Sequence, residues 1–270
     1  MAFKNRMDLH IHTDNSDDGQ HSVMLMCEYA VRRGLRAVAI TDHCECNLYK
    51  RDRYDRSIRQ SYFEARKAKA VFSGKLIVLA GMELGQALQD IKAAEDALSA
   101  NDYDFVIGSL HNVEGQEDFW KIDFKTHDAR TLIDRYYSEI LQLAKWGKFD
   151  SLAHITYPFR YINGVEHLEI DENDYSDAIR EVLKVLAQNG KALEINVSGL
   201  RQPYGKTLPE LRFVRMFKEL GGEFITVGSD AHICKDVGAD IEAGMQTAID
   251  AGFDKITLFQ NRQPLLIPIE

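Results

Sequence analysis

Apolar and polar residues alternate along this chain in two repeating patterns, one typical of helices and one typical of strands. After Ser22, which can cap a helix, apolar residues recur at helical spacing as far as Arg32-Arg33-Gly34. Cations favour the carboxyl end of a helix, and glycine tolerates the left-handed turn that ends it. The same pattern predicts further helices, each ending near a glycine, over residues 58–72, 132–143, 179–186, 213–220 and 245–251.

Short β-rich runs lie between these helical segments, at residues 37–40, 76–80, 151–155, 192–197, 224–227 and 256–259. Strands that alternate with helices predict a parallel sheet with right-handed crossovers. Seven or eight such units with polar residues at each strand exit favour a closed barrel, because an open sheet collects its site at one switch point. No linker rich in Pro, Gly or Ser interrupts the pattern, so we expect one α/β domain over residues 1–270.

Six of the nine histidines sit at or just past the ends of these apolar runs, and acids with the same placement accompany them. A parallel barrel gathers the side chains at the carboxyl ends of its strands around one mouth. Imidazole and carboxylate are the usual ligands of zinc, iron and manganese. The sequence therefore predicts a multinuclear metal site and a metal-dependent hydrolase. The histidines are His10, His12, His43, His111, His154 and His232, and the acids are Asp8, Glu83 and Asp230.

Each of these signals is weak when it is taken alone. His10 and His12 are two residues apart on a strand and point to the same face, but many such pairs are ordinary core residues. A structural role for all six histidines together is a poor explanation of their placement. The other three, His21, His127 and His167, lie in polar stretches, and we expect them at the surface.

The four cysteines do not suggest a disulfide framework in a chain of this size. Cys27 falls on the apolar face of a helix and is expected in the core. Cys44, Cys46 and Cys234 flank His43 and His232, so a thiolate ligand is one interpretation. A small buried hydrophobic residue is the commoner role of a free cysteine and is the one we favour.

Composition narrows the choice of partners. The formal net charge of −9 argues against nonspecific nucleic-acid binding, which needs a basic surface. It does not argue against a small phosphorylated substrate, because bound divalent metals would reverse the local field. No apolar stretch approaches the roughly 18 residues that span a bilayer, and the N-terminus lacks a signal-peptide core. We expect a cytoplasmic protein without membrane partners; its oligomeric state cannot be predicted.

Five motifs, in this order, resemble those of the polymerase and histidinol phosphatase (PHP) superfamily. They are DLHIHT at 8–13, TDH at 41–43, GME at 81–83, GSLH at 108–111 and GSDAH at 228–232. The resemblance implies a distorted (β/α)7 TIM-like barrel that holds two to three divalent transition metal ions. By position, it implies a first metal on His10, His12, Glu83 and Asp230, a second on Glu83, His111 and His154, and a third on Asp18, His43 and His232. Asp17 is the alternative to Asp18.

Two further segments are similar to the monofunctional histidinol-phosphate phosphatases, HITYPFR at 154–160 and EINVSGLR at 194–201. Each places an arginine, Arg160 or Arg201, just beyond a strand end. A guanidinium is a permanently charged planar fork that matches phosphate oxygens, so we expect both arginines to bind the substrate phosphate. The alternative for either is a surface ion pair, which contributes little.

These resemblances lead us to expect a metal-dependent phosphomonoesterase that hydrolyses L-histidinol phosphate to L-histidinol, a reaction of histidine biosynthesis. Metals bound by Glu83 and Asp230 would lower the pKa of a water molecule, which would then serve as the nucleophile. Asp18 or His43 would supply the proton to the leaving alkoxide; the sequence does not choose between them. The alternatives are a phosphodiesterase or nuclease, a phosphatase for another small phosphoester, and a PHP module without catalytic activity.

Overall fold

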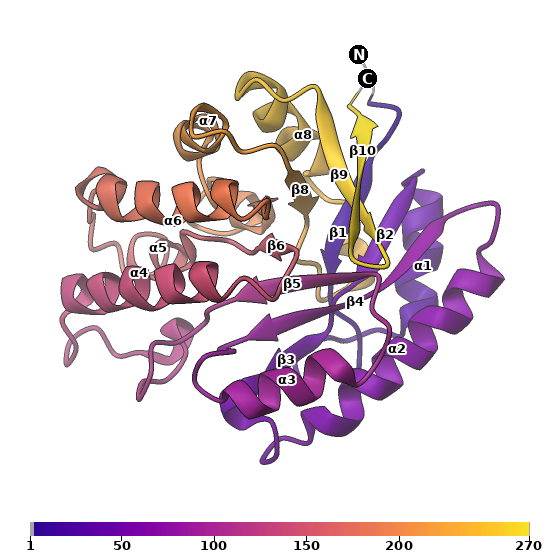
Figure 1. The fold of residues 1–270 in the computed structure, drawn as a ribbon, viewed down its shortest axis with the longest axis horizontal. Helices are drawn as coiled ribbons and strands as arrows, with labels where there is room; N and C mark the ends of the chain where they lie inside the picture. The colour runs from indigo at the N-terminus through magenta and orange to yellow at the C-terminus, as the bar shows by residue number, and fades with distance from the viewer. Residues whose placement is uncertain (1–2, 270) are drawn as a thin grey trace.

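The computed structural model describes residues 3–269 and contains a barrel of seven parallel strands (Figure 1). Neighbouring strands pair in the order β1-β2-β4-β5-β6-β7-β8. A bridge between Ile11 and Ala231 brings the two ends of this order together, so the barrel is nearly closed, as predicted. The strands are β1 (Met7–Ile11), β2 (Ala37–Ile40), β4 (Ile77–Gly85), β5 (Phe105–Ser109), β6 (Ser151–Leu152), β7 (Ala192–Asn196) and β8 (Ile225–Gly228); the short β3 (His43–Glu45) also pairs with β4.

All the predicted helices are present, and Ser22 caps the first, its hydroxyl accepting the backbone N–H of Leu25. Two helices were not predicted. The short α3 contains mainly alanine as its buried residues, and α5 has only six residues. The helices are α1 (Val23–Arg32), α2 (Tyr54–Val71), α3 (Ile91–Ser99), α4 (Ala129–Trp146), α5 (Tyr157–Ile162), α6 (Ser176–Gln188), α7 (Leu211–Glu219) and α8 (Ile241–Asp250). In the described residues, no helix is long and apolar enough to cross a membrane.

The strands are buried on both faces, because helices cover the outside of the barrel and side chains fill its inside. Val38 and Ile40 of β2 belong to an apolar cluster with Val23 and Met26 of α1. Their neighbours Ala37 and Ala39 belong to the larger cluster, with residues of the other strands. Apolar side chains thus fill both faces of the strand interiors. The polar side chains lie at the strand ends, where the barrel opens.

The last predicted strand exists but does not join the barrel. β9 (Lys255–Gln260) pairs antiparallel with β10 (Gln263–Pro268) as a separate hairpin, which corrects the expectation of another parallel strand. Asn261 and Arg262 form its turn with φ values of +49° and +63°, the conformation that tight hairpins need. Phe259 stacks on Phe105, with 5.2 Å between ring centroids, so the hairpin packs against the barrel.

Candidate active-site cavity and metal centre

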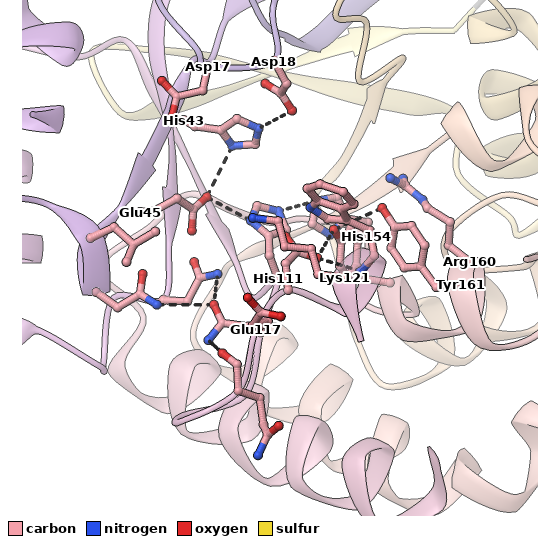
Figure 2. A pocket seen from close by; sticks show the side chains of 18 of the residues that line it. Asp17, Asp18, His43, Glu45, His111, Glu117, Lys121, His154, Arg160 and Tyr161 are labelled. Atoms are coloured by element: carbon pink, nitrogen blue, oxygen red, sulfur yellow. Dashed lines mark hydrogen bonds and ion pairs between the residues drawn. The ribbon is translucent and has the colours of Figure 1, made fainter. Parts of the chain in front are cut away.

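A cavity of about 640 Å³ opens at the carboxyl ends of the strands (Figure 2). Six of the predicted metal ligands line it, and the other three, His10, His12 and Glu83, are completely buried beneath. The six are Asp18, His43, His111, His154, Asp230 and His232. The structure therefore brings all nine predicted ligands to one place, although they come from elements spread over residues 10–232.

Glu83, at the end of β4, lies at the centre of this group. Its Oε2 is 2.9 Å from His43 Nδ1, 3.3 Å from His10 Nε2 and 3.4 Å from His12 Nε2. Its Oε1 is 3.1 Å from the Nε2 atoms of both His111 and His154. One buried carboxylate thus faces five imidazoles on its two oxygens, the arrangement expected of a carboxylate that bridges two cations.

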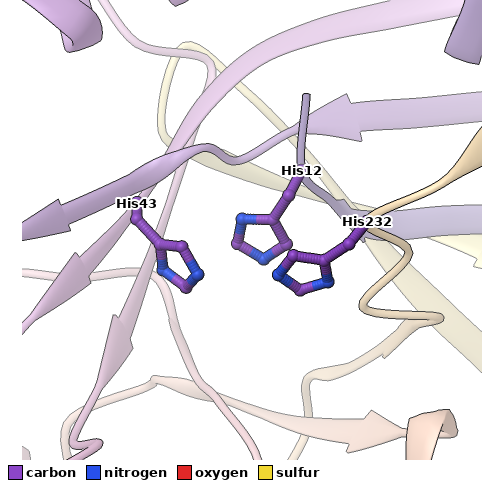
Figure 3. A group of neighbouring side chains, drawn as sticks. All are labelled: His12, His43 and His232. Atoms are coloured by element: carbon purple, nitrogen blue, oxygen red, sulfur yellow. The ribbon is translucent and has the colours of Figure 1, made fainter. Parts of the chain in front are cut away.

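A second group lies nearer the solvent. The rings of His43 and His232 each lie against the ring of His12, with centroid distances of 4.1 and 4.2 Å, and their own centroids are 5.8 Å apart (Figure 3). Asp18 Oδ2 is 3.1 Å from His232 Nε2 and 3.6 Å from His43 Nε2. Asp17 also lines the cavity, but the contacts with the two imidazoles belong to Asp18. Asp230 Oδ1 lies 3.4 Å from His12 Nε2 and so faces the deeper group.

The structure shares residues between ligand sets more widely than the predicted division into three sets suggests. Three sets have donors within 4.8 Å of one another: His12 with His43 and His232, His10 with His12 and Glu83, and His43 with Glu83 and His111. His12 and His43 each belong to two sets. The assignment of each ligand to a particular metal therefore stays a prediction.

The chemistry of these donors fits divalent metal ions. The Nε2 atoms of His10 and His12 and the Oε2 atom of Glu83 are buried, and their contacts with one another and with neighbouring groups among residues 3–269 lack hydrogen-bond geometry. Buried polar atoms are nearly always paired, so a group of unpaired ones that face each other fits a bound cation. Imidazole nitrogen and carboxylate oxygen are the donors that zinc, iron and manganese accept.

The pKa shifts of the clustered carboxylates and imidazoles also fit a divalent metal ion. Burial would raise the pKa of Glu83, but the charges of His10 and its neighbours hold that pKa well below its usual range. Burial would lower the pKa of His10, yet the carboxylates of Glu194, Glu83 and Asp230 raise it well above the usual value. Burial and the nearby His43 and His232 lower the pKa of His12. Without a cation, protons on some imidazoles must balance the carboxylates; a divalent ion would supply that charge instead.

Two carboxylates of the site were not predicted. Glu194 on β7 places Oε1 2.7 Å from His10 Nδ1, and its Oε2 accepts the His154 N–H at 2.9 Å. It fixes the His10 ring with Nε2 facing Glu83, as outer carboxylates do for metal-binding histidines. Glu45 Oε1 lies 3.0 Å from His111 Nδ1. Sequence signals existed for both: an acid within an apolar strand, and an acid two residues after His43.

Two motif aspartates hold loops instead of reaching the centre. Asp42 accepts hydrogen bonds from the backbone N–H of Thr13 and from the hydroxyl of Ser16, which secures the loop that carries Asp18. Asp8 accepts the N–H groups of Ser229 and Gly238 at 2.8 and 2.7 Å, which secures the segment that carries Asp230. Asp230 itself has a φ of +55°, an unfavourable conformation that these contacts maintain.

The two predicted phosphate-binding arginines lie differently. Arg160 is only 7% exposed, lines the cavity, and donates from Nη2 to Ser198 Oγ and to Asp230 Oδ2 at 3.2 Å. Arg201 donates to the carbonyl of Ser229 at 2.6 Å and is not among the residues that line the cavity. The structure thus brings Arg160 to the site wall and places Arg201 behind the segment that carries Asp230.

The residues expected outside the site are outside it. His127 and His167 are exposed, whereas His21 is half-buried and accepts the Cys234 N–H on Nδ1. All four cysteines are buried, and burial raises the pKa of Cys27 to about 12. Among the described residues, no candidate ligand group contains a cysteine.

Comparisons with known proteins agree with this geometry. A protein of Clostridium acetobutylicum named "Probable histidinol-phosphatase" is 30% identical over 261 residues, 94% of this chain and 97% of the relative. The histidinol-phosphatase of Lactococcus lactis is 26% identical over 259 residues, 94% of each chain. A crystal structure of the histidinol phosphate phosphatase from Lactococcus lactis, with zinc, L-histidinol and phosphate, has the same fold: its TM-score is 0.79, at 24% identity, covering 97% of this chain and 99% of that one. The PHP domain model matches residues 8–198, and the chain therefore belongs to the PHP domain family.

Proposed function

We propose that this protein is a metal-dependent phosphomonoesterase that hydrolyses L-histidinol phosphate to L-histidinol and phosphate. The observation that carries the proposal is the cluster of imidazoles and carboxylates around Glu83, with the buried Arg160 on the same cavity wall. The names of the two full-length relatives, and the zinc, L-histidinol and phosphate in the Lactococcus lactis structure, support the choice of substrate.

We infer two to three divalent ions of zinc, iron or manganese, held by the nine residues His10, His12, Asp18, His43, Glu83, His111, His154, Asp230 and His232. When bound, such ions supply Lewis acidity and lower the pKa of water toward neutrality. Protein purified without chelator should therefore contain between two and three equivalents of transition metal by elemental analysis. One equivalent or less after reconstitution would contradict this inference.

Arg160 is assigned to the phosphate. Its guanidinium is held by Ser198 and Asp230 and is buried, so its charge is weakly screened, and the neighbouring Asp230 carboxylate raises its pKa despite burial. Fixed positive charge at this place matches the negative charge that develops on the phosphoryl oxygens. Arg201 contributes to phosphate binding only if its guanidinium leaves the Ser229 carbonyl; where it lies, it orients the segment that carries Asp230.

The proton for the leaving alkoxide is assigned to Asp18 or His43. Asp18 has a side chain that is 58% exposed and lies at the cavity wall, so it can exchange protons with solvent. Despite burial, the imidazoles of His232 and His43 hold the pKa of Asp18 well below its usual range, whereas the carboxylates of Glu83 and Asp18 raise the pKa of His43. His43, whose Nε2 lies 3.6 Å from Asp18 Oδ2, is therefore the better proton donor of the two. Glu83 and Asp230 complete the proposed catalytic set as carboxylates that would hold the metals.

The experiment that tests the proposal measures phosphate release by the metal-loaded protein from L-histidinol phosphate, bis(p-nitrophenyl) phosphate and a single-stranded oligonucleotide. We expect the monoester to be hydrolysed well above both diesters. The phosphodiesterase alternative finds little support in the cavity wall, where Glu45, Glu117 and Asp118 would repel a second phosphate. A preference for diesters would overturn the proposal.

A further inference from the structure

The cavity has two chemically different sides. Figure 2 shows Arg160 and Tyr161 on one side of the histidines, and Glu45 and Glu117 on the other. The far side is built by the loops after β3, β4 and β5, which contribute carboxylates and side-chain amides. It is separated from Arg160 by the ring of Tyr157, which lies 5.0 Å from the ring of His154 and beneath the Arg160 guanidinium.

A chain of amides fixes the orientation of Gln86 on this side. The Nδ2 group of Asn112 donates to the carbonyls of Val113 and Gln116 at 3.1 and 3.0 Å, so its Oδ1 must face the other way as an acceptor. Gln86 Nε2 donates to that oxygen at 2.7 Å. The remaining atom of the Gln86 amide is therefore an oxygen, and hydrogen-bond logic leaves it only an acceptor role.

This oxygen lacks a donor. Gln86 is 2% exposed, lines the cavity, and its Oε1 has no hydrogen-bond partner in the part of the chain that the structure describes. Glu45 Oε2, at the end of the neighbouring strand β3, is likewise buried and without a partner there. Gln86 also has a φ of +50°, which costs free energy for a residue with a side chain. Such positions persist where the surrounding fold holds them, and they concentrate at ligand sites.

Asp118 adds a fixed negative charge to the same wall. Its Oδ1 accepts the Tyr157 hydroxyl at 2.9 Å and the Trp120 N–H at 3.2 Å. Two basic residues, Arg51 and Lys121, also line the cavity, but both are engaged elsewhere: Arg51 is exposed and paired with Asp52 at 2.7 Å, and the Lys121 ammonium lies over the ring of Trp120. The wall therefore offers acceptors and negative charge to a group that brings N–H donors and positive charge.

We propose that Glu45, Gln86 and Asp118 bind the nitrogen-bearing end of the leaving alcohol, and that this wall selects phosphomonoesters of cationic amino alcohols over those of neutral alcohols. The inference rests on the proposed phosphomonoesterase function and assigns its leaving-group specificity. The phosphate lies at the Arg160 side, and the alcohol extends past Tyr157 toward Asp118 and Gln86.

Two variants test the wall without touching a proposed metal ligand. Gln86→Leu removes the unpaired acceptor, and Asp118→Asn removes the charge but keeps an oxygen for Tyr157. Gln89→Leu is the matched control for the first, because Gln89 bonds to Asn112 from outside this cavity. Asp123→Asn is the control for the second, since Asp123 is an exposed acid of the same loop.

The measurement compares kcat/KM for L-histidinol phosphate with kcat/KM for p-nitrophenyl phosphate, whose leaving group brings no N–H donor. Hydrogen bonds to charged groups are strong enough that each variant should lower the ratio of the two values by about tenfold or more. The two controls should keep the wild-type ratio, and metal content should be the same in all five proteins. Calorimetric titration with L-histidinol alone should show weaker binding to the two variants.

Each other outcome has a definite meaning. An equal loss for both substrates, or an unchanged ratio, would overturn the inference while leaving the phosphatase function in place. A wild-type protein that hydrolyses neither substrate would refute the proposed function. In that case the titration decides the inference alone: L-histidinol binding that both variants weaken supports it, and absence of binding overturns it.

Discussion

The carboxylate of Glu194 offers a sharp test of how the metal centre is held. Its two oxygens accept from His10 Nδ1 at 2.7 Å, from the His154 N–H at 2.9 Å and from Asn196 Nδ2 at 3.2 Å. Glu194→Gln keeps the shape but replaces one acceptor oxygen with a donor NH₂. At least one of the three donors then faces another donor, and the His10 ring loses the partner that directs Nε2 toward Glu83.

The size of the effect follows from this geometry. Changing the residue that orients a metal-bound histidine typically lowers metal affinity or activity about 10- to 100-fold. At about 1.4 kcal/mol per factor of ten, this corresponds to about 1.4–2.8 kcal/mol of binding free energy. The full loss of a buried hydrogen bond to a charged group, about 1.5–3 kcal/mol, has the same size, so a loss of metal affinity within this range is expected.

The assay is a competition for metal between the protein and a chromophoric chelator, followed by elemental analysis and phosphate release. Glu194→Gln should retain less metal at every chelator concentration and recover activity when metal is added in excess. Glu181→Gln, a change at an exposed acid of α6, is the control. Wild-type metal affinity in Glu194→Gln would refute the orienting role; lost activity with full metal content would place Glu194 in the reaction itself.

Three further results are expected. Glu83→Gln should lower metal content and reduce activity by orders of magnitude, whereas His127→Ala, at an exposed position, should match the wild type in elemental analysis and phosphate release. An equal loss of activity in both variants would refute the division of the histidines and acids into ligands and non-ligands. Arg160→Ala should lower kcat/KM about 10- to 100-fold at unchanged metal content, and full activity would exclude it from phosphate binding. Arg262→Ala should reduce the free energy of unfolding by about 1–3 kcal/mol in urea titrations, because the buried Asp150 loses its charged partner, and should leave kcat unchanged. An unchanged unfolding midpoint would show that this ion pair does not stabilise the barrel.

The strands and ligands of the barrel were predictable because each feature has a local signature. Glycines mark the helix ends, apolar runs mark the strands, and His43 and His111 lie at or just past the ends of such runs. The run at 256–259 carries the same signature, yet it forms a hairpin. Its partner 263–268 is largely exposed, lacks the alternation of apolar and polar residues and contains two prolines, so the antiparallel pairing could not be predicted from the sequence.

The supporting residues were harder to predict because their roles depend on distant parts of the chain. Glu194 acts on His10 across 184 positions, and its meaning appears only when β1 and β7 face each other. Arg160 and Arg201 have equivalent sequence contexts, but only the first lines the cavity, since the loop after β7 directs Arg201 toward the Ser229 carbonyl. The position of a residue at a strand end predicts that it lies near the mouth of the barrel. It does not predict the direction in which the side chain points.

The hairpin at the end of the chain has a consequence for how the protein is made. Its turn reaches the strand ends opposite the mouth, where Arg262 pairs with Asp150 and its N–H donates to the Asp104 carbonyl. Asn5 donates to the Pro268 carbonyl, so the first strand is tied to the last. During synthesis, every proposed ligand emerges by residue 232, before the base of the barrel can close. A nascent chain would therefore present its metal-binding side chains before the base of the barrel is braced, and the hairpin of β9 and β10, which adds no ligand, would hold the finished centre in place.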